Sequence, residues 1–147
     1  MSPTIVDCEQ GTIEWAKARL GLPTASMFGA VMAAAKDGKD RKTRNTYMRK
    51  LAGELITGDP MENYQDANFE RGKAMEAEAR DFYAFTTDEH IERVGFIKNG
   101  SKGCSPDSLV GSDGMLEIKT AFPHILIEKI LDDDFPPEHK AQCQGNL

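Results

Sequence analysis

The sequence predicts an α/β domain in which helices surround a small sheet. The chain has 147 residues, a length typical of one domain. Apolar residues in its first half recur at helical spacing, whereas the second half contains short apolar segments around Gly-Ser-Asp-Gly at 111–114, a strong hairpin signal. The hydrophobic fraction of 39% and the charged fraction of 29% are those of an ordinary globular protein and exclude a disordered or fibrous chain.

The helices are predicted from apolar residues that recur every three or four positions and from the residues that stop them. Gly21 follows the last turn of the first helix, and Gly58 ends the helix that precedes it. The predicted helices cover residues 12–20, 27–36, 41–56, 66–85 and 123–131, and a last one begins at 136–137. This last helix is still running at Leu147, so we expect that the chain stops short of its natural end or that a partner completes the sheet.

The strands are predicted where short apolar runs border turn residues. They cover residues 91–97, 103–110 around a Ser-Pro-Asp turn, and 115–120. Because the hairpin signal at 111–114 separates the last two segments, we expect them to pair with each other.

Several classes of protein are excluded by composition. No apolar run approaches the ~20 residues of a membrane span, and the N-terminus lacks the basic and apolar regions of a secretory signal. Cys8, Cys104 and Cys143 lie too far apart for a zinc ribbon or a disulfide framework, which favours a reducing cytoplasm. The net charge of -6 argues against a protein that coats nucleic acid non-specifically.

The charge is unevenly distributed along the chain. Residues 36–50 contain seven basic and two acidic side chains, a local net charge of +5, so the rest of the chain carries -11. A solvated helix face with its loop would explain this segment. A surface that contacts phosphates, next to a carboxylate-rich metal site, would explain it equally well, and an enzyme that cuts nucleic acid with metals needs both.

Three residues carry the strongest chemical signal. Asp107 is followed, after nine intervening residues, by Glu117 and Lys119. Residues two apart on a strand share a face, and the hairpin folds Asp107 back against that strand, so two carboxylates and an ammonium meet. A divalent cation offsets the repulsion between the carboxylates, and oxygen ligands suit Mg²⁺ or Mn²⁺. A Glu-x-Lys pair alone would be an ordinary edge-strand feature, but D-x9-E-x-K across a hairpin defines the PD-(D/E)xK nuclease core.

Further motifs occur in a fixed order on both sides of this core. They are Trp15 with Arg19-Leu20-Gly21 and Thr24-Ala25-Ser26, then Arg71-Gly72-Lys73 followed by Glu76, then Cys104-Ser105-Pro106-Asp107, Leu116-Glu117-Ile118-Lys119 and Ala141-Gln142-Cys143-Gln144. In this order they resemble the lambda-exonuclease/YqaJ group of phage recombination nucleases over essentially the whole chain. One departure is Ser108, where the family usually has glycine. The other is the end of the chain, because relatives continue with more strand and helix.

The resemblance implies a restriction-endonuclease-like core, a central mixed sheet flanked by helices, in a single nuclease domain over 1–147 that lacks the family's C-terminal strand and helix. It implies that Asp107, Glu117 and the backbone carbonyl of Ile118 hold Mg²⁺, with Mn²⁺ as a substitute. Glu76 would reach a metal or the attacking water, although from its sequence alone it would be a solvated helix residue.

The resemblance also implies roles for residues around the metal. Lys119 would orient and activate the water or neutralise charge on phosphorus, and Gln142 would position that water or Lys119. Arg19, Ser26 and Ser105 would bind a 5′-phosphate, for which an Arg fork and a helix start are suited. The alternatives are a surface glutamine for Gln142, a helix-end cation for Arg19 and an ordinary N-cap for Ser26.

The implied activity is Mg²⁺-dependent 5′→3′ digestion of double-stranded DNA that releases 5′-mononucleotides and leaves a 3′ single-stranded tail for recombination. The resemblance further implies a homotrimer, a single-strand annealing recombinase as partner, and the cytoplasm of a bacterial or phage-infected host. Two alternatives stay open: another PD-(D/E)xK repair or structure-specific endonuclease, and a catalytically silent DNA-binding module.

Overall fold

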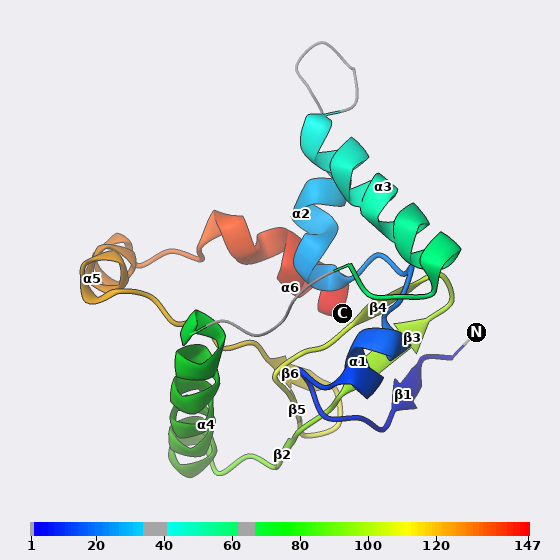
Figure 1. Cartoon of the computed structure of the whole chain (residues 1–147). Helices are drawn as coiled ribbons and strands as arrows, with labels where there is room; N and C mark the ends of the chain where they lie inside the picture. The colour runs from blue at the N-terminus through cyan, green and yellow to red at the C-terminus, as the bar shows by residue number, and fades with distance from the viewer. Residues whose placement is uncertain (1, 34–40, 62–66) are drawn as a thin grey trace.

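The computed structural model describes residues 2–33, 41–61 and 67–147, with side chains from residue 72 onward in the last range (Figure 1). The first part of the basic segment, 36–40, and the Arg71 side chain therefore lie outside the described residues. In chain order the elements are β1 (Thr4–Val6), α1 (Ile13–Ala18), the 3-10 turn η1 (Ala25–Met27), α2 (Phe28–Val31), α3 (Lys42–Thr57), α4 (Ala67–Thr87), β2 (Ile91–Glu92), β3 (Phe96–Asn99), β4 (Lys102–Cys104), β5 (Ser108–Val110), β6 (Gly114–Leu116), α5 (Pro123–Asp132), η2 (Pro137–His139) and α6 (Lys140–Asn146).

The described strands form two antiparallel three-stranded sheets with the orders β1-β3-β4 and β2-β5-β6. The predicted hairpin is confirmed, because Val110 pairs with Gly114 and Ser108 pairs with Leu116. A single parallel bridge, between Thr24 and Gly103, joins the segment before η1 to β4. The helices lie around these sheets, so the architecture is mixed α/β (Figure 1).

The strand predicted over 91–97 is divided into β2 and β3, and Gly95 shows why. A Cβ atom on Gly95 would lie 2.0 Å from the carbonyl oxygen of Cys8. The N-terminal segment therefore passes directly against the chain between the two strands. Only glycine leaves room for this approach.

The strand predicted over 115–120 ends early, at Leu116. Beyond it, the Ile118 N–H donates to Asp107 and the Glu117 carboxylate accepts bonds from side chains, not from a neighbouring strand. The prediction of a longer strand was wrong because these residues serve the site described below.

The helices follow their predicted signals with small shifts. Thr12 caps α1 through a bond from the Trp15 N–H, and Gly58 ends α3 in the left-handed conformation with φ of 75°. The helix predicted to start at Met27 is instead a 3-10 turn followed by α2, which ends at Val31.

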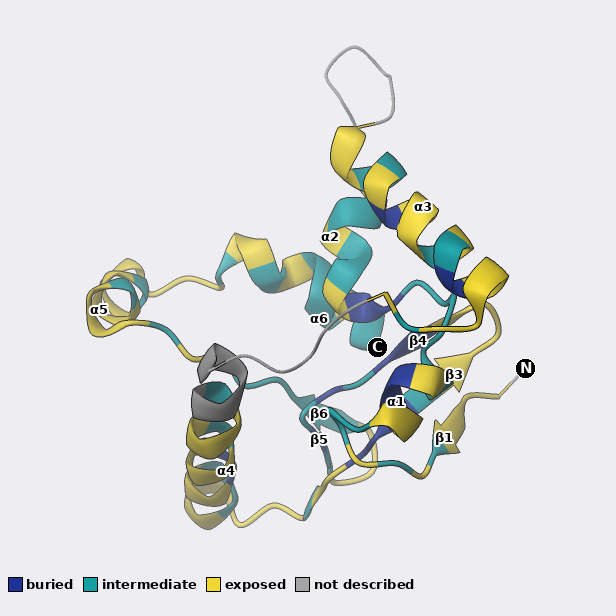
Figure 2. Cartoon of the chain, in the orientation of Figure 1, coloured by how far each residue is buried: buried dark blue, intermediate teal, exposed yellow. Residues whose placement is uncertain are grey.

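The apolar core lies where the sheets meet α1, η1 and α3 (Figure 2). Its buried hydrophobic residues are Trp15, Ala16, Ala25, Tyr47, Val94, Phe96 and Cys104. Helix α6 joins this core through Gly145, where a Cβ atom would lie 2.5 Å from the Phe28 ring. This close approach fixes α6 against α2 and η1.

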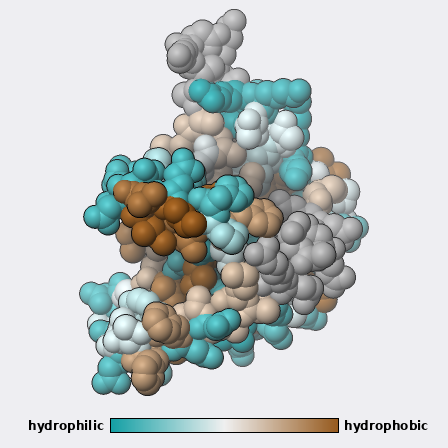
Figure 3. Space-filling model, turned by 90° about the vertical axis from the view of Figure 1, so that its left-hand side faces the viewer, coloured by the Kyte–Doolittle hydropathy of each residue, from teal (hydrophilic) through white to brown (hydrophobic). Residues whose placement is uncertain are grey.

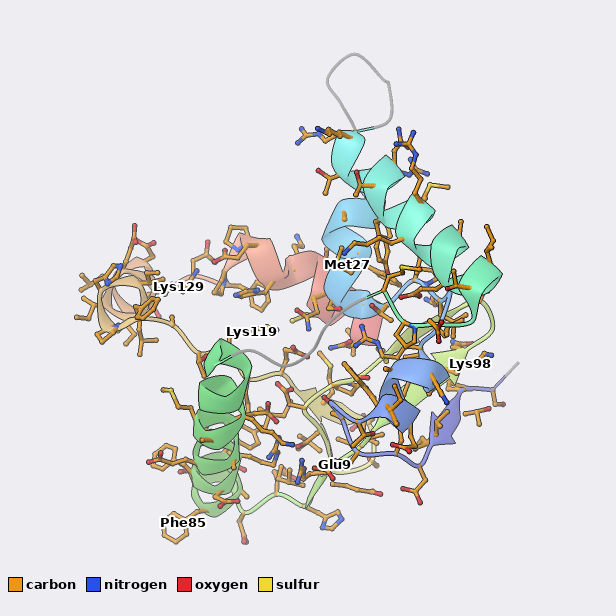
Figure 4. The ribbon with its side chains drawn as sticks, in the orientation of Figure 1. Glu9, Met27, Phe85, Lys98, Lys119 and Lys129 are labelled. Carbon is orange, nitrogen blue, oxygen red and sulfur yellow. The ribbon has the colours of Figure 1, made fainter. Side chains whose placement is uncertain are left out.

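Helices α4 and α5 both keep large apolar side chains exposed. Phe82 and Phe85 project from α4, and Figure 4 shows Phe85 pointing outward near its last turn. Helix α5 stands apart from the other elements in Figure 1, and a hydrophobic patch lies on this side of the molecule (Figure 3). The exposed apolar residues of α5 include Leu126, Ile127, Ile130 and Leu131. None of the described helices is both long and apolar enough to cross a membrane.

Candidate active site

Asp107 is held in a rigid turn between two buried neighbours. Pro106 and Ser108 are among the largest fully buried residues of the described chain. Across the hairpin, the Ile118 N–H donates to Asp107 Oδ2 over 2.5 Å. The hairpin therefore brings the Asp107 carboxylate to the segment that carries Glu117 and Lys119, as the spacing predicts.

Glu117 lies in a cage of donors. Its side chain is only 8% exposed. Glu117 Oε1 accepts from Lys119 Nζ at 2.7 Å and from Gln142 Nε2 at 2.5 Å, and Asn146 Nδ2 donates to Glu117 Oε2 at 2.9 Å. The structure thus brings together Glu117, Lys119 and Gln142, and Figure 4 places Lys119 in the region between α4 and α6. Sequence reasoning missed Asn146, although its position four residues after Gln142 places both on one face of α6.

Glu76 enters the site from α4. Its Oε1 accepts a bond from Arg80 Nη2, one helical turn later. Arg80 is buried, and it also donates from Nε to Ser108 Oγ at 2.8 Å and from Nη2 to the Asp107 carbonyl at 3.3 Å. Helix α4 is therefore fastened to the turn that holds Asp107. Sequence reasoning missed Arg80, whose signal was the Glu-x-x-x-Arg spacing on a helix.

The electrostatics of Asp107 agree with this arrangement. The pKa of Asp107 is raised to about 6, chiefly by burial and also by the nearby charges of Glu117 and Glu76, against the Ile118 N–H and Lys119, which lower it. Glu117 and Glu76 therefore lie close enough to the partly desolvated Asp107 carboxylate to raise its pKa. Such a group of carboxylates attracts positive charge.

The donor set fits a hard divalent cation. Asp107, Glu117 and Glu76 offer carboxylate oxygens, the ligands that Mg²⁺ and Mn²⁺ prefer. Among the described residues, however, no three His, Cys, Asp or Glu side chains form a ready cluster around one point. Each carboxylate instead accepts bonds from protein donors, so metal binding would exchange some of these bonds for metal contacts. The Ile118 N–H donates to Asp107. The role of the Ile118 carbonyl as a metal ligand stays a prediction.

A cleft of about 520 Å³ opens beside Asp107 and Glu76. Its walls come from the segment between β1 and α1, from α4 and from the chain before β3. Gln10, which sequence reasoning missed, donates from Nε2 to the carbonyls of Val94 at 2.8 Å and Pro106 at 3.0 Å. Across the cleft, Lys73 Nζ lies 3.3 Å from Glu9 Oε1. The cleft therefore borders two of the three carboxylates, Asp107 and Glu76.

The three predicted phosphate ligands are connected through two other residues. The Arg19 guanidinium lies 4.0 Å from the centre of the Trp15 ring, and Trp15 Nε1 donates to Ser105 Oγ at 2.8 Å. Arg19 Nη2 also donates to Thr24 Oγ1 at 3.2 Å, and the Thr24 and Ser26 hydroxyls lie 3.3 Å apart. Ser26 is the second residue of η1, so it is not the helix N-cap that the sequence suggested.

The described part of the basic segment forms the first half of α3. Lys42 and Lys50 line a shallow cleft there with Tyr47. Figure 1 shows α3 and α4 at different ends of the molecule, so this surface is separate from the carboxylate cluster. A substrate that touches both must extend across the protein.

Comparison with known proteins decides the family. Residues 14–147 match the family model of the YqaJ-like viral recombinase domain. The chain belongs to this family. The predicted resemblance is therefore confirmed, and family membership extends over nearly the whole chain.

Two solved structures resemble the chain closely. LHK-Exo in complex with dAMP is 36% identical with a TM-score of 0.79, and the match covers 92% of this chain and 67% of that one. An alkaline exonuclease (LHK-Exo) from Laribacter hongkongensis is 36% identical with a TM-score of 0.76, covering 89% of this chain and 64% of that one. The chain thus spans about two thirds of the length of these relatives. Comparison with curated proteins returned no match. The predicted restriction-endonuclease-like α/β class is confirmed by these structural matches.

Proposed function

We propose that this YqaJ-family chain is a Mg²⁺-dependent 5′→3′ exonuclease of double-stranded DNA that releases 5′-mononucleotides and leaves 3′ tails. The observation that carries the proposal is the hairpin that joins Asp107 to Ile118 and places Lys119 on Glu117. Membership of a viral recombinase family and 36% identity to an alkaline exonuclease support a nuclease acting on DNA.

Asp107 and Glu117, with the Ile118 carbonyl and Glu76, are the residues that would hold Mg²⁺ or Mn²⁺. The metal, when bound, supplies positive charge that offsets the negative charge developing on the scissile phosphate. Buried neighbours on both sides of Asp107 and the donor cage of Glu117 keep these carboxylates in place beforehand. This preorganisation avoids a costly rearrangement during the reaction.

Lys119 and Gln142 supply donors next to the reacting phosphate. Lys119 is 39% exposed at its side chain, so its ammonium is able to leave Glu117 and meet a water or a phosphate oxygen. Gln142 bonds the same carboxylate oxygen and takes over its support when Lys119 moves. In this proposal Lys119 orients the attacking water and Gln142 positions both.

Arg19, Ser26 and Ser105 would hold the 5′-phosphate of the DNA end. A guanidinium gives phosphate a charge-assisted fork, and the two hydroxyls add donors. Stacking on Trp15 fixes the plane of the Arg19 fork before the substrate arrives. A terminal phosphate held at this point would set the distance to the carboxylates, so that each cut releases one nucleotide.

The exposed apolar faces of α4 and α5 support an assembly. Large exposed apolar patches on a protein surface typically mark sites of contact with other molecules. We propose that these faces take part in a homotrimer and in contact with a single-strand annealing recombinase. Cys8, Cys104 and Cys143 form no disulfide bonds. This supports the proposal that the protein acts in a reducing bacterial cytoplasm.

Digestion of DNA with defined ends tests the proposal. Linear duplexes with a 5′-phosphate or a 5′-hydroxyl, and closed circular DNA, are incubated with Mg²⁺ or with EDTA. We expect mononucleotides from the phosphorylated linear duplex with Mg²⁺ alone. Cleavage of the closed circle would indicate an endonuclease instead, and binding without cleavage under every condition would indicate a silent DNA-binding module.

A further inference from the structure

Arg80 joins the two segments that carry carboxylates. It is 8% exposed and sits on α4 one turn after Glu76. Its Nη2 bonds the Glu76 carboxylate and the Asp107 carbonyl, and its Nε bonds Ser108 Oγ. One guanidinium therefore contacts the helix and the turn at the same time.

This contact differs from an ordinary helical ion pair. Exposed Glu–Arg pairs at this spacing contribute little to stability and have no fixed geometry. Arg80 is buried, and Ser108 and the Asp107 carbonyl hold its guanidinium from outside the helix. The planar fork of an arginine can hold several acceptors at fixed angles, which a lysine cannot do.

Ser108 completes the arrangement. It is 0% exposed, accepts from Arg80 Nε at 2.8 Å and donates to the Asp107 carbonyl at 2.6 Å. Among the described non-glycine residues only Asp88 and Asp133 have positive φ, so the backbone at Ser108 does not require glycine. A glycine here would leave Arg80 Nε without this acceptor. The serine therefore gives this chain an anchor for Arg80.

We propose that Arg80 and Ser108 are positioning residues that hold the Glu76 carboxylate at the site formed by Asp107 and Glu117. This inference rests on the proposed function, because it gives Glu76 a place at the metal site. Arg80 binds one oxygen of Glu76, which leaves the other oxygen for the cation. Partners that orient a ligand in this way typically change metal affinity by roughly 10- to 100-fold when they are lost.

The test measures Mn²⁺ binding by titration calorimetry in variants that keep the net charge. Arg80→Lys keeps the cation but loses the fork, and Ser108→Ala removes only the anchor of the guanidinium. We expect each to weaken Mn²⁺ binding, Arg80→Lys by roughly 10- to 100-fold. Arg93→Lys is the matched control, since Arg93 lines the same cleft but has no place in this network, and its Mn²⁺ affinity should stay unchanged.

A cycle with Glu76→Gln separates positioning from folding. If Arg80 acts through Glu76, Arg80→Lys should cause almost no further loss of Mn²⁺ affinity when Glu76 is already replaced by Gln. Wild-type affinity in both Arg80→Lys and Ser108→Ala, or an equal loss from Arg80→Lys in the two backgrounds, would overturn the inference. If Arg80→Lys does not fold, as judged by its melting temperature, wild-type affinity in Ser108→Ala overturns it alone.

The proposed function fails in a different way. The proposed metal site itself would be contradicted if the wild-type protein bound no Mn²⁺, or if an Asp107→Ala variant bound it normally. Wild-type binding that Asp107→Ala abolishes but Arg80→Lys leaves intact would keep the site and remove only the role of Arg80.

Discussion

Trp15 Nε1 lies 2.8 Å from Ser105 Oγ, which ties helix α1 to the segment two residues before Asp107. The same Trp15 side chain also stacks against the Arg19 guanidinium, which lies over its ring. One buried indole thus sets the distance between an arginine and a carboxylate that lie far apart in the sequence. If a substrate end binds Arg19, Trp15 would set the distance between that end and Asp107.

Arg19→Ala should slow digestion of 5′-phosphorylated ends by about ten- to a hundredfold. A charge-assisted contact to phosphate contributes roughly 1.5–3 kcal/mol, and ~1.4 kcal/mol corresponds to a factor of ten. Rates on 5′-hydroxyl ends should fall much less. The measurement compares one variant on two substrates, and equal losses on both would mean that Arg19 only supports the stack on Trp15.

Asp107→Asn should stabilise the metal-free protein at neutral pH. The folded state raises the pKa of Asp107 from 3.8 to about 6, so the stability that its protonated form contributes is complete below 3.8 and lost as the pH rises through about 6. This difference corresponds to about 3 kcal/mol at most. The asparagine oxygen still accepts from the Ile118 N–H.

Urea unfolding in EDTA at pH 7.5 and pH 4 checks this prediction. The variant should unfold at higher urea than wild type at pH 7.5, and the difference should shrink at pH 4. A variant that is equally stable or less stable at pH 7.5 would contradict the strained environment inferred for Asp107.

Lys119→Met should separate binding from turnover. The ammonium bonds Glu117 Oε1 at 2.7 Å, so its loss frees that oxygen and should leave Mn²⁺ affinity intact or improved. Turnover should fall by about 10²–10⁴, the range typical of a lost proton-transfer or charge-stabilising group. Calorimetry and single-turnover cleavage measure the two effects, with Lys129→Met on α5 as a control for the loss of a lysine. Near-normal turnover would end the role proposed for Lys119.

Asn146→Ala should reduce cleavage by roughly 10- to 100-fold, because Asn146 donates to the second oxygen of Glu117 at 2.9 Å. Gln144 on the same helix is exposed, and the hydrogen bonds to the Glu117 carboxylate come from Lys119, Gln142 and Asn146, so Gln144→Ala serves as the control. Rates are compared at saturating and limiting Mg²⁺. If both variants cleave alike, the cage around Glu117 does not need its third donor.

The hairpin and its three chemical residues were predictable because the signals are local. Gly-Ser-Asp-Gly fixes the turn. Glu117 and Lys119 meet as their two-residue spacing suggested, with Lys119 Nζ 2.7 Å from Glu117 Oε1, although β6 ends before them at Leu116. The end of α3 at Gly58 was predictable for the same reason, since glycine is the usual left-handed residue after the last turn of a helix. Helix α1 instead ends at Ala18, before Gly21.

The contacts between distant segments were not predictable in this way. Gln10 and Arg80 look like ordinary polar residues until the fold places their partners beside them. The early end of β6 has the same cause, because the chain after Leu116 bonds Asp107 and α6 instead of another strand. Most of these partners lie between 25 and 96 residues away, beyond any local pattern.

The family match begins at residue 14, yet the cleft depends on residues before it. Strand β1 pairs with β3, and Gln10 bonds the carbonyl immediately before Asp107. A gene trimmed to the matched boundary would therefore encode a protein in which β3 lacks its β1 partner and the turn that carries Asp107 lacks its bond from Gln10. Anyone who grafts or shuffles this domain should cut ahead of β1.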